Sequence, residues 1–317
     1  VAGLNSCHIF SVIGQNLLKK SASFPFLAAV LVGLPFFSSM MITNDVALLT
    51  FVPFAIAVLD MAGQKKYTAI IVVWQTIAAN LGSMTTPFGN PQNIYLFSKY
   101  GFSLWEFIKI IFPYSLFSLI LLLICTKTLP KDKIQVHFAQ EDHMEEPEKL
   151  ILFFVLFLLC ILCVIRIVPY PLMLFIVVIA VYWKKKSLFR QVDYRLLITF
   201  ICFFLFSGNV SRMESVQELF SHWVTHYPIL CGTLLSQIIS NVPAAVLLSS
   251  FTNSGTGLLI GCNIGGLGTP VASLASLISW KLFQKSEGAK DQSYMKKFTI
   301  WNMLFLIILL GFTLFFL

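Results

Sequence analysis

The sequence contains few charged residues. Of its 317 residues, 11% are charged and 57% are hydrophobic, which is more apolar surface than a soluble core of this length can bury. The apolar stretches are continuous rather than alternating, so a transmembrane β-barrel is excluded and helices are the expected membrane-crossing elements. The composition therefore predicts an all-α polytopic membrane protein, with the lipid bilayer as its surroundings.

Residues that support metal-dependent or hydrolytic chemistry are also scarce. The chain has five histidines, which stand in polar stretches or at the ends of apolar runs, and no HExxH motif. Its seven cysteines lie mostly inside apolar runs, without the paired spacing of a disulfide framework. Cys160 and Cys163 form a CxxC in a Leu- and Phe-rich run, which favours packing in lipid over zinc binding. We therefore expect no cofactor and no enzyme activity; a membrane-embedded enzyme is the weakest alternative.

The net charge of +8 comes from short basic clusters between apolar runs, which the positive-inside rule explains without any nucleic-acid partner. If these clusters face the cytoplasm, the number of crossings predicts an inner (cytoplasmic) membrane protein with its C-terminus outside. The polar stretch over 127–149 then becomes a cytoplasmic linker. Asp60 lies close to Lys65 and Lys66, so we expect an ion pair at the membrane interface.

An internal repeat divides the chain. In the first half ITNDVALLTFVPF (42–54) precedes ANLGSMTTPFGNPQN (79–93), and in the second half ISNVPAAVLLSSF (239–251) precedes CNIGGLGTPVASLAS (262–276). The first copy is expected to form a hairpin that enters the membrane from the inside, and the second copy a hairpin that enters from the outside. The two copies are therefore predicted to be inverted. The predicted units are a first inverted repeat over 1–126, the linker over 127–149, a second inverted repeat over 150–297 and a C-terminal transmembrane helix over 298–317.

The repeated segments interrupt apolar runs with Gly, Pro, Asn, Ser and Thr. Such residues break the helical hydrogen-bond ladder, and the freed backbone groups must face protein, water or a ligand. Paired interruptions in two halves indicate a transporter site, where helix N-termini favour anions and unwound carbonyls favour cations. Asp45 is the acidic side chain well inside an apolar run, which predicts a cation ligand or a proton carrier.

These segments resemble the ion-transporter superfamily that holds arsenite-efflux permeases, sodium/proton antiporters, citrate/metal symporters and divalent-anion/sodium symporters, with citrate transporter-like and arsenite-permease-like features. The similarity covers nearly the whole chain and is most specific at NLGSMTTPFGNPQN and at SNVPA followed by NIGGLGTPVASLASLISWK. It implies two inverted repeats, each with a re-entrant helical hairpin and a broken transmembrane helix. It also implies a homodimer and elevator-type movement of the substrate.

The resemblance assigns substrate and ion contacts to the hairpin tips and to the unwound segments. These residues are Thr43, Asn44, Asp45, Thr85, Thr86, Pro87, Gly89, Asn90, Pro91, Asn93, Ser240, Asn241, Val242, Gly268, Thr269, Pro270 and Ser273. A sodium ion is expected near Asn44, Asp45 and Asn241. The tips read Thr-Asn-Asp and Ser-Asn-Val, unlike the repeated Ser-Asn-Thr of the sodium/dicarboxylate branch, which argues against a dicarboxylate.

The leading prediction is a secondary active transporter of a small anion, either an organic carboxylate such as citrate or an inorganic oxyanion, coupled to sodium or protons. The alternative is a sodium/proton antiporter that uses Asp45. A channel is disfavoured because it does not need inverted copies of one site. Comparison of the two halves also predicts that about fifty residues, or two further spans, precede Val1.

Overall fold

The structure is a computed structural model that describes residues 23–134, 147–184, 186–192, 194–210, 212–286 and 293–316. These residues are mostly α-helical. Within these ranges there is no β-strand, and Ser23 and Lys133 form an isolated bridge. Residues 1–22 of the first predicted repeat and residues 135–146 of the predicted linker lie outside the described residues.

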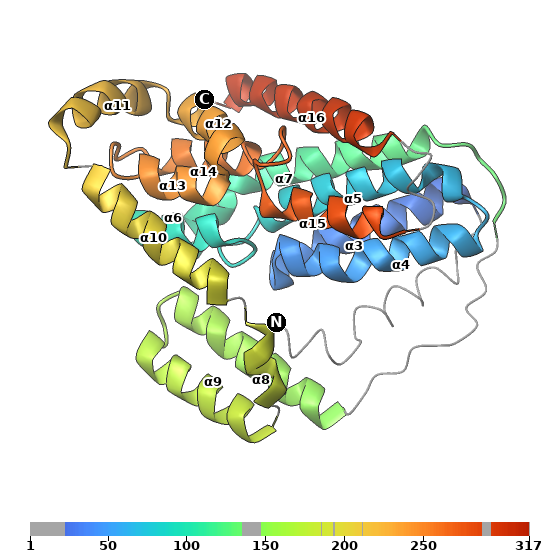
Figure 1. Cartoon of the computed structure of the whole chain (residues 1–317), viewed down its shortest axis with the longest axis horizontal. Coiled ribbons are helices and arrows are strands. Elements are labelled where there is room, and N and C mark those ends of the chain that lie inside the picture. The colour runs from blue at the N-terminus through green and yellow to red at the C-terminus, as the bar shows by residue number, and fades with distance from the viewer. Residues whose placement is uncertain are drawn as a thin grey trace.

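The helices follow one another with short connections (Figure 1). They are α3 (Phe24–Ile42), α4 (Asn44–Met61), η1 (Lys65–Tyr67), α5 (Thr68–Ser83), α6 (Pro91–Tyr100), α7 (Leu104–Lys127), α8 (Pro147–Val164), α9 (Tyr170–Lys184), η2 (Lys186–Gln191), α10 (Tyr194–Val210), α11 (Glu214–His226), α12 (Pro228–Ile239), α13 (Asn241–Leu248), α14 (Gly255–Ile264), α15 (Leu274–Gln284) and α16 (Tyr294–Phe316).

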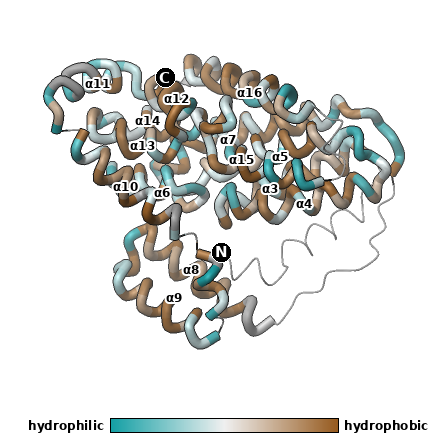
Figure 2. The backbone as a smooth tube through the Cα atoms, in the orientation of Figure 1, coloured by the Kyte–Doolittle hydropathy of each residue, from teal (hydrophilic) through white to brown (hydrophobic). Residues whose placement is uncertain are grey.

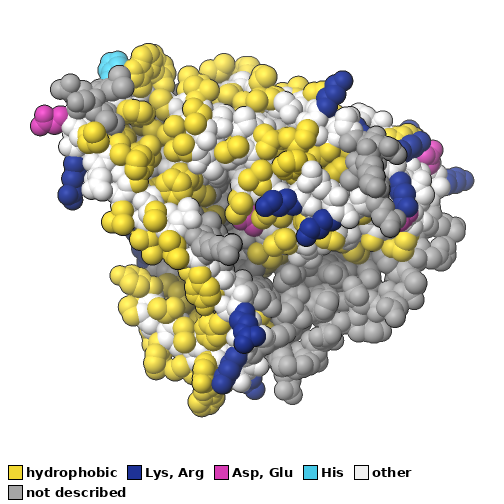
Figure 3. All heavy atoms as spheres, in the orientation of Figure 1, with side chains coloured by type: hydrophobic (Ala, Val, Ile, Leu, Met, Phe, Trp, Pro, Cys, Tyr) yellow, Lys and Arg dark blue, Asp and Glu magenta, His cyan; other side chains and the backbone are white. Residues whose placement is uncertain are grey.

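Several helices have the length and the apolar composition of membrane-spanning helices. Among the described residues, 4 helices (α3, α4, α7 and α16) are long and apolar enough to cross a bilayer. Figure 2 shows hydrophobic residues along most helices, with hydrophilic residues gathered mainly at helix ends and in connections. Figure 3 shows hydrophobic side chains over much of the visible face. The prediction of an all-α, multi-pass membrane protein is confirmed at this level.

Two helices, α5 and α14, are buried on nearly every side. In α5 every residue except Ile70 is buried, and in α14 every residue except Thr256. A helix that is apolar all round belongs inside a bundle. Helix α5 packs against α3, α4, α7, α15 and α16, and α14 packs chiefly against α12, α13 and α6. The polar side chains of these two helices are therefore held inside the protein rather than in lipid.

Charged residues occur at the ends of helices. Asp60, at the end of α4, forms the expected ion pair with Lys65, with 2.8 Å between Oδ1 and Nζ. Arg166, in the turn after α8, donates to the carbonyls of Phe97 and Ser98, at 3.3 Å each. These carbonyls lie near the C-terminus of α6, where the helix dipole favours a cation. Arg166 therefore links the turn between α8 and α9 to the interrupted part of the bundle.

Candidate functional site

Two chain reversals share one backbone conformation. Thr43 joins α3 to α4 with φ 72° and ψ 151°, and Ser240 joins α12 to α13 with φ 74° and ψ 154°. Non-glycine residues rarely adopt positive φ, and for a β-branched threonine this conformation is strained. Each reversal is followed directly by a buried asparagine, Asn44 or Asn241, at the start of the next helix. The two tips are thus built alike from different sequences.

Two helices are interrupted next to these tips. Helix α5 ends at Ser83 and α6 begins at Pro91, and α14 ends at Ile264 and α15 begins at Leu274. The threonine before the proline of each interruption bonds a carbonyl of the neighbouring tip: Thr86 Oγ1 donates to Met40 O at 2.6 Å, and Thr269 Oγ1 donates to Gln237 O at 2.9 Å. Met40 and Gln237 stand at the same distance before their reversals. Each interrupted helix therefore holds the tip of its own half in the same way.

Buried amides join the two halves. Asn44 Nδ2 donates to Asn80 Oδ1 at 2.9 Å, and Ser273 Oγ donates to the same oxygen at 3.0 Å. Asn263 Nδ2 donates to Asn93 Oδ1 at 2.7 Å, and Asn263 Oδ1 accepts from Asn90 Nδ2 at 3.2 Å. Hydrogen bonds between buried polar groups fix one arrangement, because breaking one leaves a costly unpaired group. The network therefore sets the positions of both interruptions relative to each other.

Glycine is required where the first interruption turns back on itself. A Cβ on Gly89 would overlap the backbone carbonyl of Ser83. Asn90 then caps α6, because its Oδ1 accepts from the backbone N–H of Asn93 at 3.0 Å. In the second interruption Gly268 has φ 99°, and a Cβ there would overlap the Gln237 amide. Both glycines shape the loops.

Replacing Gly89 by alanine is expected to lower the apparent melting temperature of the detergent-solubilised protein by roughly 3–10 °C. The new Cβ would clash with the backbone of Ser83, so no rotamer change relieves it. Overpacking costs about 1–3 kcal/mol, at roughly 2–4 °C per kcal/mol. Gly311→Ala in α16 is the matched control, since a Cβ there meets nothing within 4 Å. Equal melting temperatures for the two variants would show that the loop has room for a side chain.

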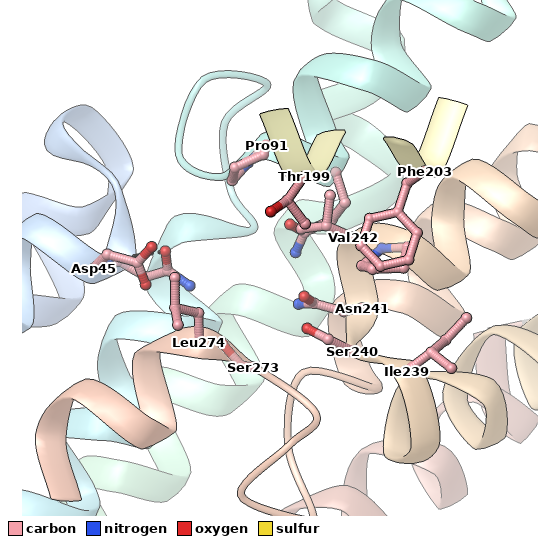
Figure 4. Close-up of a pocket in the computed structure, with 13 residues that line it drawn as sticks. Asp45, Pro91, Thr199, Phe203, Ile239, Ser240, Asn241, Val242, Ser273 and Leu274 are labelled. Carbon is pink, nitrogen blue, oxygen red and sulfur yellow. Dashed lines mark hydrogen bonds between the residues drawn. The ribbon is translucent and has the colours of Figure 1, made fainter. Parts of the chain in front are cut away.

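The first turns of four helices line one cavity of about 190 Å³. These are α4 with Asn44 and Asp45, α6 with Pro91 and Gln92, α13 with Asn241, Val242 and Pro243, and α15 with Ser273 and its neighbour Leu274. Thr199 and Phe203 of α10 and the end of α12, with Ile239 and Ser240, complete the wall. Figure 4 shows these side chains converging from separate helices. N-terminal N–H groups and the helix dipole make such a convergence favourable for an anion.

The cavity has an unusual set of polar groups. Among the described residues that line it, none is Lys, Arg or His, and Asp45 is the one charged side chain. Asp45 stands in the first turn of α4, where its backbone N–H donates to Asn44 Oδ1 at 2.9 Å. The amides of Gln92 and Asn241 are buried, with 2% and 4% of each residue exposed. A ligand here would meet helix N-termini, amides, hydroxyls and a single carboxylate.

The structure separates the sequence-predicted residues into cavity-lining residues, loop-forming residues and Thr43. Seven of them line the cavity: Asn44, Asp45, Pro91, Ser240, Asn241, Val242 and Ser273. Others build the loops and tips around it; for example, Thr85 Oγ1 bonds Ser115 Oγ, and Asn93 Nδ2 donates to the carbonyl of Thr86. Pro87, Gly89, Asn90, Gly268, Thr269 and Pro270 belong to the same loops, and Thr43 lines a separate apolar cavity beside Phe88 and α8.

Sequence reasoning missed six residues of the cavity wall, which are Gln92, Thr199, Phe203, Ile239, Pro243 and Leu274. Gln92 and Leu274 directly follow predicted site residues, so their place in the first turn of a helix was a usable signal. Thr199 and Phe203 lie in an uninterrupted apolar helix, α10, where no local pattern marks them. The described residues also contain no group of three or more His, Cys, Asp or Glu that could hold a metal ion.

A multi-pass helical bundle whose interrupted helices meet at an internal cavity is typical of membrane transporters. The chain belongs to the citrate transporter family, which it matches over residues 1–254. It is therefore a membrane transporter of this family.

Its similarity to two of the following proteins covers most of the chain. It is 31% identical over 274 residues to the uncharacterized transporter MJ0456 of Methanocaldococcus jannaschii, spanning 85% of this chain and 74% of the relative. It is 28% identical over 310 residues to the inner membrane protein YbiR of Escherichia coli, spanning 95% of this chain and 80% of the relative. A second uncharacterized transporter of M. jannaschii, MJ0672, is 27% identical over 161 residues, which are 48% of this chain and 36% of the relative.

Proposed function

We propose that the protein is a secondary active transporter that moves a small organic carboxylate, coupled to sodium ions or protons. The observation that supports this proposal most directly is that the first turns of α4, α6, α13 and α15 line the same cavity. Each helix start presents N–H groups without intrahelical partners and the positive end of a dipole. Together they bind an anion without a cationic side chain, as half-helices do in transporters.

The wall of the cavity favours an organic anion over an inorganic oxyanion. Phe203, Val242 and Leu274 give it an apolar part beside the helix starts. A carboxylate with a carbon skeleton buries that surface, whereas a fully hydrated oxyanion has nothing apolar to place there. The family's description as citrate transporters supports the same choice.

Asp45 supports a coupling cation beside the anion. Acidic side chains inside membrane proteins mark the pathways of ions and protons. We place a sodium ion near Asn44, Asp45 and Asn241, or alternatively a proton on Asp45 itself. The cation would also offset repulsion between Asp45 and the transported anion, so neither is expected to bind strongly alone.

The paired geometry supports two inverted repeats, each with a re-entrant hairpin and a broken helix. The matched reversals at Thr43 and Ser240, and the matched threonine bonds of Thr86 and Thr269, are what two copies of one unit would produce. With this design we further propose elevator-type alternating access, a homodimer, an inner-membrane location, a cytoplasmic 127–149 linker and an external C-terminus.

The test is uptake into proteoliposomes that contain the intact protein. Radiolabelled citrate, succinate, phosphate and arsenite would each be offered with an inward sodium gradient, with an inward proton gradient and with none. Accumulation of a carboxylate that depends on one gradient supports the proposal and identifies the coupling ion. Gradient-dependent accumulation of phosphate or arsenite alone would overturn the organic part of the proposal.

Asp45 also supports a second candidate, a sodium/proton antiporter, because an antiporter needs the carboxylate but no anion. The same vesicles with a trapped pH-sensitive dye distinguish the two. Sodium-driven alkalinisation or acidification in the absence of any added carboxylate, together with no accumulation of the four anions, would favour the antiporter.

Asn44 and Asn241 occupy matched positions but are held differently, which leads to different expected effects. Asn44→Ala removes the bond to Asn80 and is expected to lower the apparent melting temperature by about 5 °C, since a buried hydrogen bond contributes about 1 kcal/mol and stranding its partner costs about 1–3 kcal/mol. Asn241→Ala removes no side-chain bond to the described residues and is expected to leave the melting temperature unchanged. Both variants should lose uptake. An equal fall in stability for the two would contradict this assignment.

A further inference from the structure

Gln92 is buried but its side chain is not used to hold the protein together. It follows Pro91 in the first turn of α6, only 2% of the residue is exposed, and it lines the cavity. Its side-chain amide forms no hydrogen bond within the part of the chain that the structure describes. The helix does not need it as a cap, because Asn90 already accepts the N–H of Asn93.

Other amides near the cavity are used to hold the protein together. Asn44 bonds Asn80, and Gln237 donates to the carbonyls of Gly265 and Leu267 at 3.0 Å each while its Oε1 accepts from Thr269 N. Asn241 is the amide that resembles Gln92: its backbone N–H donates to Ala272 O at 3.0 Å, but its side chain forms no bond to the described residues.

An unpartnered amide at the edge of a cavity has a physical cost. A polar group that faces a cavity without a protein partner must bond water or an occupant of the cavity, because leaving it unbonded raises its free energy. Gln92 and Asn241 reach the same cavity from the starts of two different helices, α6 and α13. Their N–H₂ groups are therefore kept available for an occupant, and hydrogen bonds from an amide to an ionised oxygen are stronger than those to a neutral one.

We infer that Gln92 is a specificity-determining residue, which donates its Nε2 hydrogens to a carboxylate of the transported anion together with Asn241 Nδ2. This inference rests on the proposed function and adds a contact that the motif residues do not include. Because both amides are neutral and Asp45 is the charged group of the wall, charge at position 92 decides how well an anion is tolerated. A carboxylate there would repel the substrate.

The test compares three variants in proteoliposomes, using whichever of citrate, succinate, phosphate and arsenite the wild-type protein accumulates. Gln92→Glu keeps the shape and replaces the donor by a negative charge, and Gln92→Met keeps the length without a donor. Gln284→Glu, at the exposed end of α15, is the matched control. We expect the KM for the anion to rise about tenfold to a hundredfold in Gln92→Met, the range of one charge-assisted hydrogen bond, and further in Gln92→Glu.

A second readout separates anion recognition from a general defect. At an anion concentration that saturates each variant, the concentration of coupling cation that gives half-maximal uptake should stay within about twofold in Gln92→Met, since the side chain contacts the anion. Wild-type KM values for the anion in both Gln92 variants would overturn the inference while leaving the proposed function intact. No accumulation of any of the four anions by the wild type would instead defeat the proposed function. Gel filtration of each solubilised variant checks folding. If Gln92→Glu does not fold, the KM of Gln92→Met decides the test.

Discussion

Asn263→Ala is expected to lower the apparent melting temperature of the solubilised protein by roughly 10 °C or more and to abolish uptake. Asn263 is buried and bonds both Asn90 and Asn93 across the two halves of the chain. Its loss leaves Asn93 Oδ1 without this donor and removes one hydrogen bond of Asn90, and each change lowers the free energy of unfolding by about 1–3 kcal/mol. It also leaves a void, which lowers stability further. At roughly 2–4 °C per kcal/mol, the sum is large for a single substitution.

Asn302→Ala is the control for the loss of a buried amide that does not join the two halves. Asn302 is fully buried in α16, but its Nδ2 donates within its own helix, to Phe298 O at 3.0 Å, and its Oδ1 has no partner among the described residues. Its replacement removes similar volume without breaking a link between halves, so a smaller fall is expected. A fall as large as that of Asn263→Ala, measured by thermal gel filtration, would contradict a special role for the amide network.

The positions of the chain reversals could be predicted from sequence because they break a strong pattern. An apolar run that contains Thr-Asn-Asp or Ser-Asn-Val cannot continue as a lipid-facing helix without leaving polar groups unpaired. The structure ends α3 at Ile42 and α12 at Ile239, at these segments. The interruptions before α6 and α15 carried the same signal, through glycine and proline.

Which of these polar groups faces the cavity could not be predicted in the same way. Thr86 and Asn93 look like ligands in sequence, yet their side chains bond the carbonyl of Met40 and the carbonyls of Met84 and Thr86. Loop residues compete for the same polar partners, and the tertiary arrangement decides the outcome. The contribution of α10 was hidden for another reason: Thr199 and Phe203 stand in a helix without any break, and reach the cavity through long-range packing.

Asp45→Asn is expected to reduce gradient-driven accumulation of the anion by about a hundredfold or more, while the protein stays folded. Asp45 is the charged side chain among the described residues of the cavity wall. Asparagine has nearly the same shape but cannot neutralise a cation, and the loss of about 3 kcal/mol of cation binding corresponds to roughly a hundredfold. Because the helix starts that attract the anion remain, anion binding should survive and coupling should fail.

The two effects are measured separately. Uptake under the gradient identified for the wild type reports coupling, and stabilisation of the solubilised protein by the same anion reports binding. Asp60→Asn, at the far end of α4 and paired with Lys65 at the surface, is the matched control; an exposed pair contributes only about 0–1 kcal/mol, so this variant should transport normally. Undiminished accumulation in Asp45→Asn would show that the coupling cation does not bind at this site. Loss of anion binding together with coupling would instead show that the anion depends on Asp45 or on the cation bound there, because a removed negative charge by itself cannot weaken attraction for an anion.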